Sequence, residues 1–225
     1  MEVVPAPSRY SEWLDFVFGR IRPGEDPWQL DWKFDASPED LALLLAHTMQ
    51  HCGRDLVSYS DDQLATGLRA LLMVPLSRIA YRLSQAQLPD ATKLTVLTSL
   101  PNLYANCLSD RSPPVLGHLS ETRGSALAGV TYMLWDECPL TNWISVKDDQ
   151  GRSALVALLG NVLMQRPANP ACLESALHGL GHLVTAHPKY EPEIIAQIDA
   201  FLASRPIGRP ELKTYAAAAR KGHIQ

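Results

Sequence analysis

Apolar residues recur every three or four positions along most of this chain, in segments of about 10 to 17 residues that proline or glycine separates. This period places apolar side chains on one face of a helix. The alternation of apolar and polar residues that is typical of strands, and the Asn-Gly pairs that join strands in hairpins, hardly occur. The sequence therefore predicts an all-α fold.

The clearest helix start is SPEDLALLLAHTMQHCG. Ser37 can accept backbone hydrogen bonds as the N-cap, and Pro38 suits the first helical position because its missing N–H needs no partner there. Gly53 is the expected end of this helix. Other helices are expected over about 10–21, 60–87 with a kink or division near Val74, 90–107 with an interruption at Pro101, 113–119, 125–135, 153–165, 171–185, 192–203 and 210–221.

The helical segments share a weak internal pattern. GLRALLMVPLSRI, GSALAGVTYML, RSALVALLGNVL and ESALHGLGHLV each combine small residues with leucines at helical spacing. Small residues let neighbouring helices approach closely, as stacked helix pairs require. We expect a single domain in which residues 37–225 form a helical repeat, and residues 1–36 form a helix and a Trp-containing loop packed on it.

ESALHGLGHL, followed by PEIIAQIDAFL, resembles the inner and outer helices of HEAT or armadillo-type repeats, in which an Ala-x-x-x-Leu-Gly pattern marks the inner helix. Ala176, Leu177, Leu180 and Gly181 match packing positions of that pattern. The resemblance implies an α-solenoid of stacked antiparallel helix pairs whose concave face binds another protein. It brings no catalytic residue with it.

Composition narrows the partners and the compartment. The net charge is −4, the pI is near 6.0, and the basic residues are scattered, so a nucleic-acid partner is not expected. No apolar run reaches 18 residues and no basic segment precedes an apolar one at the N-terminus, which predicts no membrane partner. The cysteines form no CxxC pair and are expected to be buried, reduced thiols of a cytoplasmic protein: Cys52, Cys107, Cys138 and Cys172.

Two HxxxH pairs are the main chemical candidates. His178 and His182 lie one helical turn apart, with Glu174 one turn earlier, and His47 and His51 form a second pair. Positions four apart drift by about 40° around a helix, so the first three residues form one shallow stripe. Two such pairs from different helices could together bind zinc or another transition metal.

Two observations favour a packing role for these histidines instead. The pairs are about 130 residues apart, so a repeat array would hold them at opposite ends. The residues after the first histidine are Thr48 and Gly179, not the glutamate of a zinc-protease HExxH motif. No metal and no cofactor are therefore expected, and the histidines are interpreted as lining a helix groove or the concave face.

Other motifs do not predict an enzyme. Asp136 and Glu137 in WDECP could act as acid and base, but we interpret them as a helix end or as solvent-facing groups. GxSxG, a P-loop and a strand followed by GxGxxG are absent from the sequence. The expected function is non-enzymatic.

We therefore predict a module that binds another protein. Large amphipathic side chains suit such interfaces, and partly exposed tryptophans are expected as anchors, with burial in the core as their alternative. The candidate contact residues are Trp28, Trp32, Trp135, Trp143, Glu174, His178 and His182. A narrower hypothesis, from the mild acidity, small size and lack of catalytic motifs, is a bacterial immunity-type inhibitor of a toxin. The alternatives are a metalloprotein or enzyme that uses the HxxxH pairs, and a structural subunit of a homo-oligomer.

Overall fold

A computed structural model of the chain describes residues 6–20, 26–74, 76–143, 149–165, 168–204 and 206–224, without the side chains at 142, 143 and 149–153. Every regular element in these ranges is helical, and they contain no strand. The all-α prediction is confirmed.

The helices differ in length and are interrupted by short 3-10 and π turns. The α-helices are α1 (Tyr10–Leu14), α2 (Pro38–Asp55), α3 (Asp61–Leu72), α4 (Arg78–Gln85), α5 (Asp90–Leu103), α6 (Ser109–Arg111), α7 (Ala126–Glu137), α8 (Asp149–Met164), α9 (Pro170–Ala186), α10 (Glu191–Ser204) and α11 (Pro210–Ala219). The 3-10 and π turns are η1 (Asp15–Gly19), η2 (Pro27–Gln29), η3 (Tyr104–Leu108), η4 (Gly117–Leu119), η5 (Pro139–Trp143) and η6 (Pro188–Tyr190).

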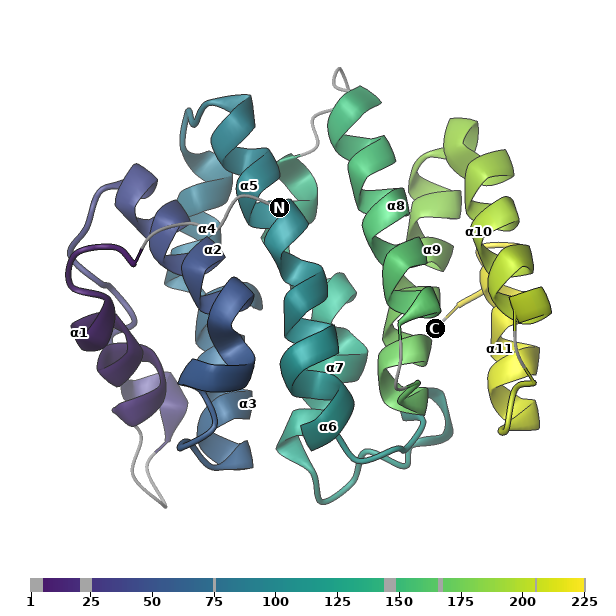
Figure 1. The fold of residues 1–225 in the computed structure, drawn as a ribbon, viewed down its shortest axis with the longest axis horizontal. Coiled ribbons are helices and arrows are strands. Elements are labelled where there is room, and N and C mark those ends of the chain that lie inside the picture. Colours follow the sequence, from purple (N-terminus) through teal and green to yellow (C-terminus); the bar gives the residue numbers. More distant parts are fainter. Residues whose placement is uncertain are drawn as a thin grey trace.

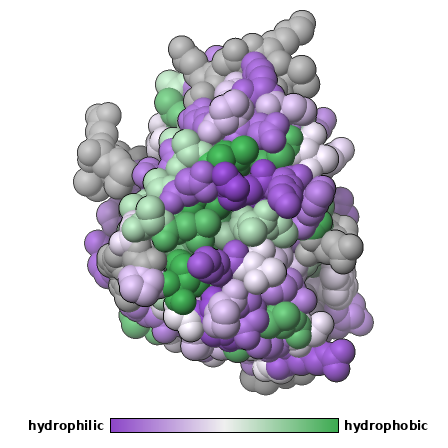
Figure 2. Space-filling model, turned by 90° about the vertical axis from the view of Figure 1, so that its right-hand side faces the viewer, coloured by the Kyte–Doolittle hydropathy of each residue, from purple (hydrophilic) through white to green (hydrophobic). Residues whose placement is uncertain are grey.

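The longer helices pack in two rows (Figure 1). In one row α2 contacts α5, α5 contacts α8, and α8 contacts α10. In the other row α3 contacts α7, α7 contacts α9, and α9 contacts α11. The two rows meet where α8 of the first row packs against α9 of the second. The end of the molecule beside α10 and α11 carries an apolar patch bordered by hydrophilic side chains (Figure 2).

One apolar cluster, which extends from Trp13 to Ala219, forms most of the core. The described part of the first 36 residues packs on this core. Trp13 is fully buried and its Nε1–H donates to Thr48 Oγ1 of α2 at 2.9 Å. The guanidinium of Arg82 in α4 donates to the carbonyl oxygens of Phe34 and Ala36, each at 2.8 Å. These bonds tie the N-terminal segment to two different helices.

The sequence predicted the start of α2 correctly and its end incorrectly. Ser37 Oγ accepts a hydrogen bond from Asp40 N at 3.1 Å at the start of α2. The expected end of α2 at Gly53 is wrong, because the helix continues to Asp55. A Cβ at Gly53 would lie 2.6 Å from the carbonyl oxygen of Asn106. This glycine therefore allows close helix contact and does not end the helix.

Three predictions concern prolines. The division near Val74 is confirmed, since α3 ends at Leu72 and α4 begins at Arg78, while Pro75 lies outside the described residues. The interruption at Pro101 is wrong: Pro101 lies inside α5, which continues to Leu103 and passes directly into η3 and α6. A proline removes one backbone donor, and this single loss does not end the helix here. The helix over 113–119 is also wrong, and only the 3-10 turn η4 forms there.

Candidate metal centre

Two neighbouring helices of the second row bring three potential metal ligands together. Asp136 lies in the last turn of α7, and His178 and His182 lie one turn apart on α9. Because α7 and α9 pack against each other, the Asp136 carboxylate faces the imidazoles from across the helix interface. The sequence separation of about 40 residues hides this proximity.

The ligand atoms of these three residues converge. His178 Nε2 lies 2.8 Å from Asp136 Oδ1, and His182 Nε2 contacts the same oxygen. The two Nε2 atoms are 3.0 Å apart. All three atoms lie within 4.8 Å of one another, and no other group of three such residues does so in the part of the chain that is described.

The three ligand atoms are arranged so that either protons or a divalent cation could join them. A proton on each Nε2 satisfies the carboxylate but leaves two N–H groups crowded at 3.0 Å. A divalent ion would accept all three lone pairs at once. Two ligands at about 2.05 Å from such an ion lie about 2.9 Å apart at right angles and about 3.3 Å apart in a tetrahedron. The nitrogen separation lies between these values, whereas both nitrogen–oxygen contacts are shorter, so an ion would enter only if the Asp136 carboxylate moved outward.

Charge and exposure also suit a metal. Burial by itself would raise the pKa of the Asp136 carboxyl, but hydrogen bonds with His178 and His182 hold it well below its ordinary value. The carboxylate is therefore ionised at neutral pH, as a ligand must be. The His178 side chain is buried, while those of Asp136 and His182 are 21% and 48% exposed. An ion can therefore reach the cluster from solvent.

A second residue layer holds His178 in place. Its Nδ1 hydrogen-bonds with the hydroxyl of Tyr215 on α11, and the two rings are nearly parallel, at 11°. Tyr215 also hydrogen-bonds with Tyr132 of α7, and burial raises the pKa of both phenols, so they stay neutral. Metal-binding histidines usually have such a partner on the second ring nitrogen.

Glu174 does not join this cluster. Its carboxylate is fully buried and accepts hydrogen bonds from the backbone N–H groups of Gly117 at 2.5 Å and His118 at 3.2 Å, and it also contacts His118 Nδ1. The drift of about 40° per four residues carries Glu174 away from the face of His182. The prediction that Glu174 and His178 offer surface for a partner is wrong, because both are buried; only His182 is exposed.

The four candidate tryptophans lie in different environments. Trp28 is 62% exposed. Trp32 and Trp135 are 2% and 6% exposed, so the expectation that they are partly exposed is wrong. Trp32 packs on Phe16 and its Nε1–H donates to the Pro27 carbonyl, while Trp135 packs against α9 at Gly179. The side chain of Trp143 lies outside the described residues.

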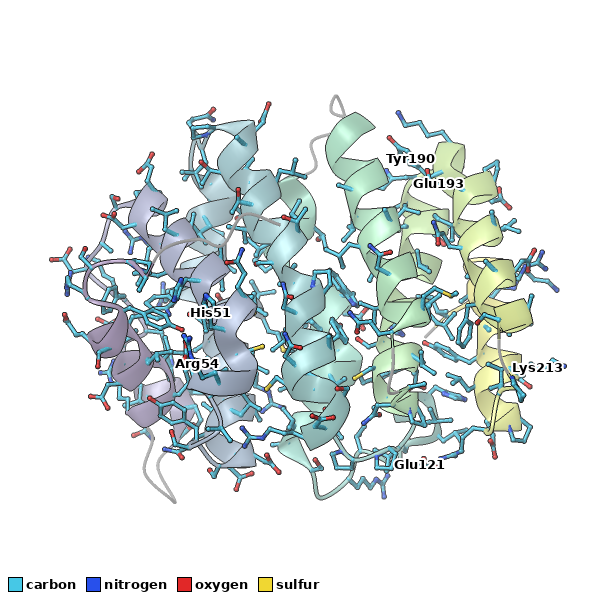
Figure 3. The ribbon with its side chains drawn as sticks, in the orientation of Figure 1. His51, Arg54, Glu121, Tyr190, Glu193 and Lys213 are labelled. Carbon is cyan, nitrogen blue, oxygen red and sulfur yellow. The ribbon has the colours of Figure 1, made fainter. Side chains whose placement is uncertain are left out.

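The second HxxxH pair has different surroundings. His47 and His51 lie on α2, their ring centroids are 4.3 Å apart, and the ring of Tyr10 meets His47 edge-on at 4.5 Å. His51 lies on the left-hand side of the molecule (Figure 3), whereas α9 lies to the right of α5, behind α8 (Figure 1). The two pairs do not combine into one four-ligand site.

Asp136 is the candidate ligand that sequence reasoning missed. Its location in the last turn of α7 was a usable signal, because a helix end carries partial negative charge and disfavours an acidic side chain there. The two other polar signals, His178 and His182, stand out in a largely apolar helix. Only the packing of α7 on α9 brings the acid and the histidines together.

The cysteines take no part in the centre. All four are free and buried, and burial raises the pKa of Cys138 and of Cys172 to about 12. These two thiols stay protonated at neutral pH, and thiolates, not thiols, bind metals.

Neither protein-family models nor curated proteins nor solved structures match this chain. In the described part of the chain, no helix combines the length and the apolar character needed to cross a membrane. The fold and the cluster together define an all-helical protein with a two-histidine, one-carboxylate group between two helices, and its function is argued from that geometry.

Proposed function

We propose that this chain is a metal-binding protein that holds one divalent transition-metal ion at Asp136, His178 and His182. The observation that carries the proposal is the convergence of the three ligand atoms, from two helices, within 4.8 Å. Imidazole nitrogens and a carboxylate oxygen form the ligand set of many zinc and ferrous sites. We therefore expect zinc or ferrous iron.

The hydrogen bonds around the cluster support this proposal. With the ion on Nε2, His178 would keep its proton on Nδ1 and donate it to Tyr215 Oη. The Tyr215 hydroxyl would in turn donate to the hydroxyl oxygen of Tyr132, with which it already forms a hydrogen bond. His178 Nδ1 and the Tyr215 hydroxyl would then each have an acceptor. Three protein ligands leave at least one coordination position open, as in metal sites that bind small molecules.

Zinc content tests the proposal. Untagged protein is equilibrated with zinc, passed over a desalting column and analysed for metal, and its zinc affinity is measured by calorimetry. The expected result is one zinc ion per chain for the wild type. His182→Ala should weaken zinc binding by more than about 100-fold, since loss of a mere second-layer partner already costs about 10- to 100-fold. His182 is half exposed, so this substitution should leave the fold intact.

His51→Ala is the matched control, because it removes the second histidine of the other HxxxH pair and should leave zinc binding unchanged. Absence of stoichiometric zinc in the wild type would contradict the proposal. So would equal losses in His182→Ala and His51→Ala, since these would indicate nonspecific binding to exposed imidazoles.

A second candidate function concerns the rows of helices. We propose that they form a HEAT or armadillo-type α-solenoid that binds another protein, such as a toxin blocked by an immunity-type inhibitor. The observation in its favour is Trp28, which is 62% exposed beside a cavity of about 360 Å³ that Met73, Val74 and Met133 help to line. Exposed aromatic side chains beside an apolar cavity are typical of protein interfaces.

The chain itself can be used as bait to test this second function. The expected result is one stoichiometric partner recovered by the wild type and lost with Trp28→Ala. Trp28 packs outside the core, so the variant should be as stable as the wild type. Equal recovery with both proteins would show that this surface is not the interface.

A further inference from the structure

A cavity of about 160 Å³ adjoins the metal centre. It lies between the end of α7, η5, α8 and α9. Most of its lining is apolar, from Trp135, Leu155, Leu159, Leu183 and Ala186, and its polar lining residues are Thr141, His182 and His187. The Thr141 hydroxyl already donates to the Cys138 carbonyl at 2.8 Å. The cavity therefore offers mainly apolar contact to a guest.

The cavity and the metal centre share a wall. His182 is a ligand of the proposed ion and also lines the cavity. Gly179, which follows His178, and Trp135, which precedes Asp136, line it as well. Of the three ligands, His182 is the one that itself lines the cavity. A molecule bound to the ion on the side of His182 would extend past this imidazole into the cavity.

The charges favour an anionic head group on such a molecule. A divalent ion with one carboxylate and two neutral imidazoles carries a net charge of about +1, and a bound ion is usually the largest local charge in its site. A carboxylate or a similar oxyanion would neutralise this charge at the open coordination position. The apolar lining then requires an apolar remainder.

The size of the cavity limits that remainder. An apolar cavity of about 150 Å³ is known to bind one benzene molecule, so 160 Å³ holds an apolar group of about six carbon atoms at most. Pockets for drug-sized ligands are usually about 300–1,000 Å³. A short chain of a few carbon atoms suits this cavity, and a ring system with substituents does not.

We propose that the metal centre binds a small molecule with an oxyanion head group on the ion and a short, unbranched apolar tail in this cavity. This inference rests on the proposed metal-binding function. It names the class of ligand, a short-chain carboxylate or an analogue of one, and the residues that select it. Leu155, Leu159 and Leu183 contact the tail, and His182 separates tail from head.

A series of straight-chain alkyl hydroxamic acids tests the proposal, because their head groups bind zinc and only their tails differ. Zinc content is measured first, and binding to the zinc-loaded protein is then followed by calorimetry. A buried methylene contributes enough to strengthen binding about fourfold. Affinity should rise about fourfold per methylene and stop rising after about five carbons, when the cavity is full.

Two variants locate the tail. Ala186 is exposed on α9 yet lines the cavity, so Ala186→Trp should occupy the cavity without disturbing the core. It should remove the dependence on chain length while the shortest hydroxamate still binds. Ala200→Trp is the control, at an exposed position of α10 that does not line the cavity, and it should behave as the wild type.

The two proposals fail in different ways. If the protein holds zinc but all chain lengths bind equally, the metal site stands and the ligand class is wrong. An unchanged length dependence in Ala186→Trp would likewise place the tail elsewhere and overturn the inference. If the protein holds no zinc, the proposed function fails and takes the ligand proposal with it.

Discussion

The two HxxxH pairs have the same spacing and opposite surroundings. In α9, His178 and His182 face Asp136, which comes from another helix and pairs with no Lys or Arg side chain in the part of the chain that the structure describes. In α2, the carboxylate near His51 is Asp55, which belongs to the same helix and accepts hydrogen bonds from Arg54 Nε at 2.6 Å and Tyr10 Oη at 2.9 Å. One carboxylate is available to a metal ion, and the other is already neutralised.

The residue after the first histidine shows a similar contrast. Thr48 follows His47, and its hydroxyl accepts the Trp13 indole N–H. Gly179 follows His178, and a Cβ there would lie 2.8 Å from Trp135 Cγ. A tryptophan from a neighbouring helix packs at each position, but only the glycine lets that helix come close. The comparison teaches that neighbouring helices, more than the HxxxH spacing, decide whether a pair can bind metal.

The largest difference in zinc affinity between the two HxxxH pairs is expected when the carboxylate beside each pair is replaced by an amide. Asp136→Asn keeps the shape of the side chain but removes its charge, and we expect zinc affinity to fall by more than about 100-fold, measured by calorimetry. Asp55→Asn is the matched change beside the other pair and should leave zinc affinity unchanged. If Asp55→Asn also weakens binding, the contrast between the two carboxylates is wrong.

The next largest effect is on the free energy of unfolding, and it depends on how closely α7 approaches α9. Gly179→Ala places a Cβ against the Trp135 ring, and such overpacking should lower the free energy of unfolding by about 2 kcal/mol despite the better helix propensity of alanine. Gly129→Ala on α7 is the control, because the nearest atom to its Cβ is 3.8 Å away. It should stabilise the protein by about 1 kcal/mol. Urea denaturation measures both, and equal stabilisation by the two changes would show that α7 and α9 have room to separate.

Periodicity and caps made much of the fold predictable. The all-α class, the start of α2 at Ser37 and the division between α3 and α4 follow from local signals that a sequence displays directly. Gly53 misled because it serves the close contact of α2 with Asn106, and Pro101 misled because the helix continues past it through η3 and α6.

The candidate site was only half predictable. His178 and His182 can be found by spacing alone, but their third partner depends on which helix packs against α9. Asp136 lies 42 positions from His178, and helical periodicity carries no information on pairing at that distance. Trp135 was misjudged for the same reason, since its burial depends on the contact with Gly179.

A smaller effect is expected from the tyrosines that contact each pair. Tyr215→Phe removes the hydroxyl that fixes His178 Nδ1, and zinc affinity should fall about tenfold. Tyr10→Phe is the matched change at the other pair, where the hydroxyl bonds to Asp55. It should leave zinc affinity unchanged and cost about 1 kcal/mol of stability. Unchanged zinc binding in Tyr215→Phe would show that the phenol has no part in orienting the ligand.

The smallest effect is in the acid stability of the metal-free protein. Hydrogen bonds from Arg54 and Tyr10 outweigh burial and lower the pKa of Asp55, and His178 and His182 lower that of Asp136 further below its ordinary value. A carboxyl whose pKa is lowered by folding stabilises the fold above its unfolded pKa of about 3.9, and this stability is lost as the pH falls through the folded pKa.

Urea denaturation of the metal-free protein, with a chelator present, should therefore show two differences in the free energy of unfolding between pH 5 and pH 2. Asp55→Asn should lower the free energy of unfolding by less than about 1 kcal/mol at pH 5 and by still less at pH 2. Asp136→Asn should show the larger change between the two pH values, because its folded pKa is lower and the loss extends over a wider range of pH. An equal pH dependence in the two variants would mean that His178 and His182 hold the Asp136 carboxylate no more strongly than Arg54 and Tyr10 hold Asp55. The cluster would then lose the electrostatic feature that distinguishes it as a candidate metal site.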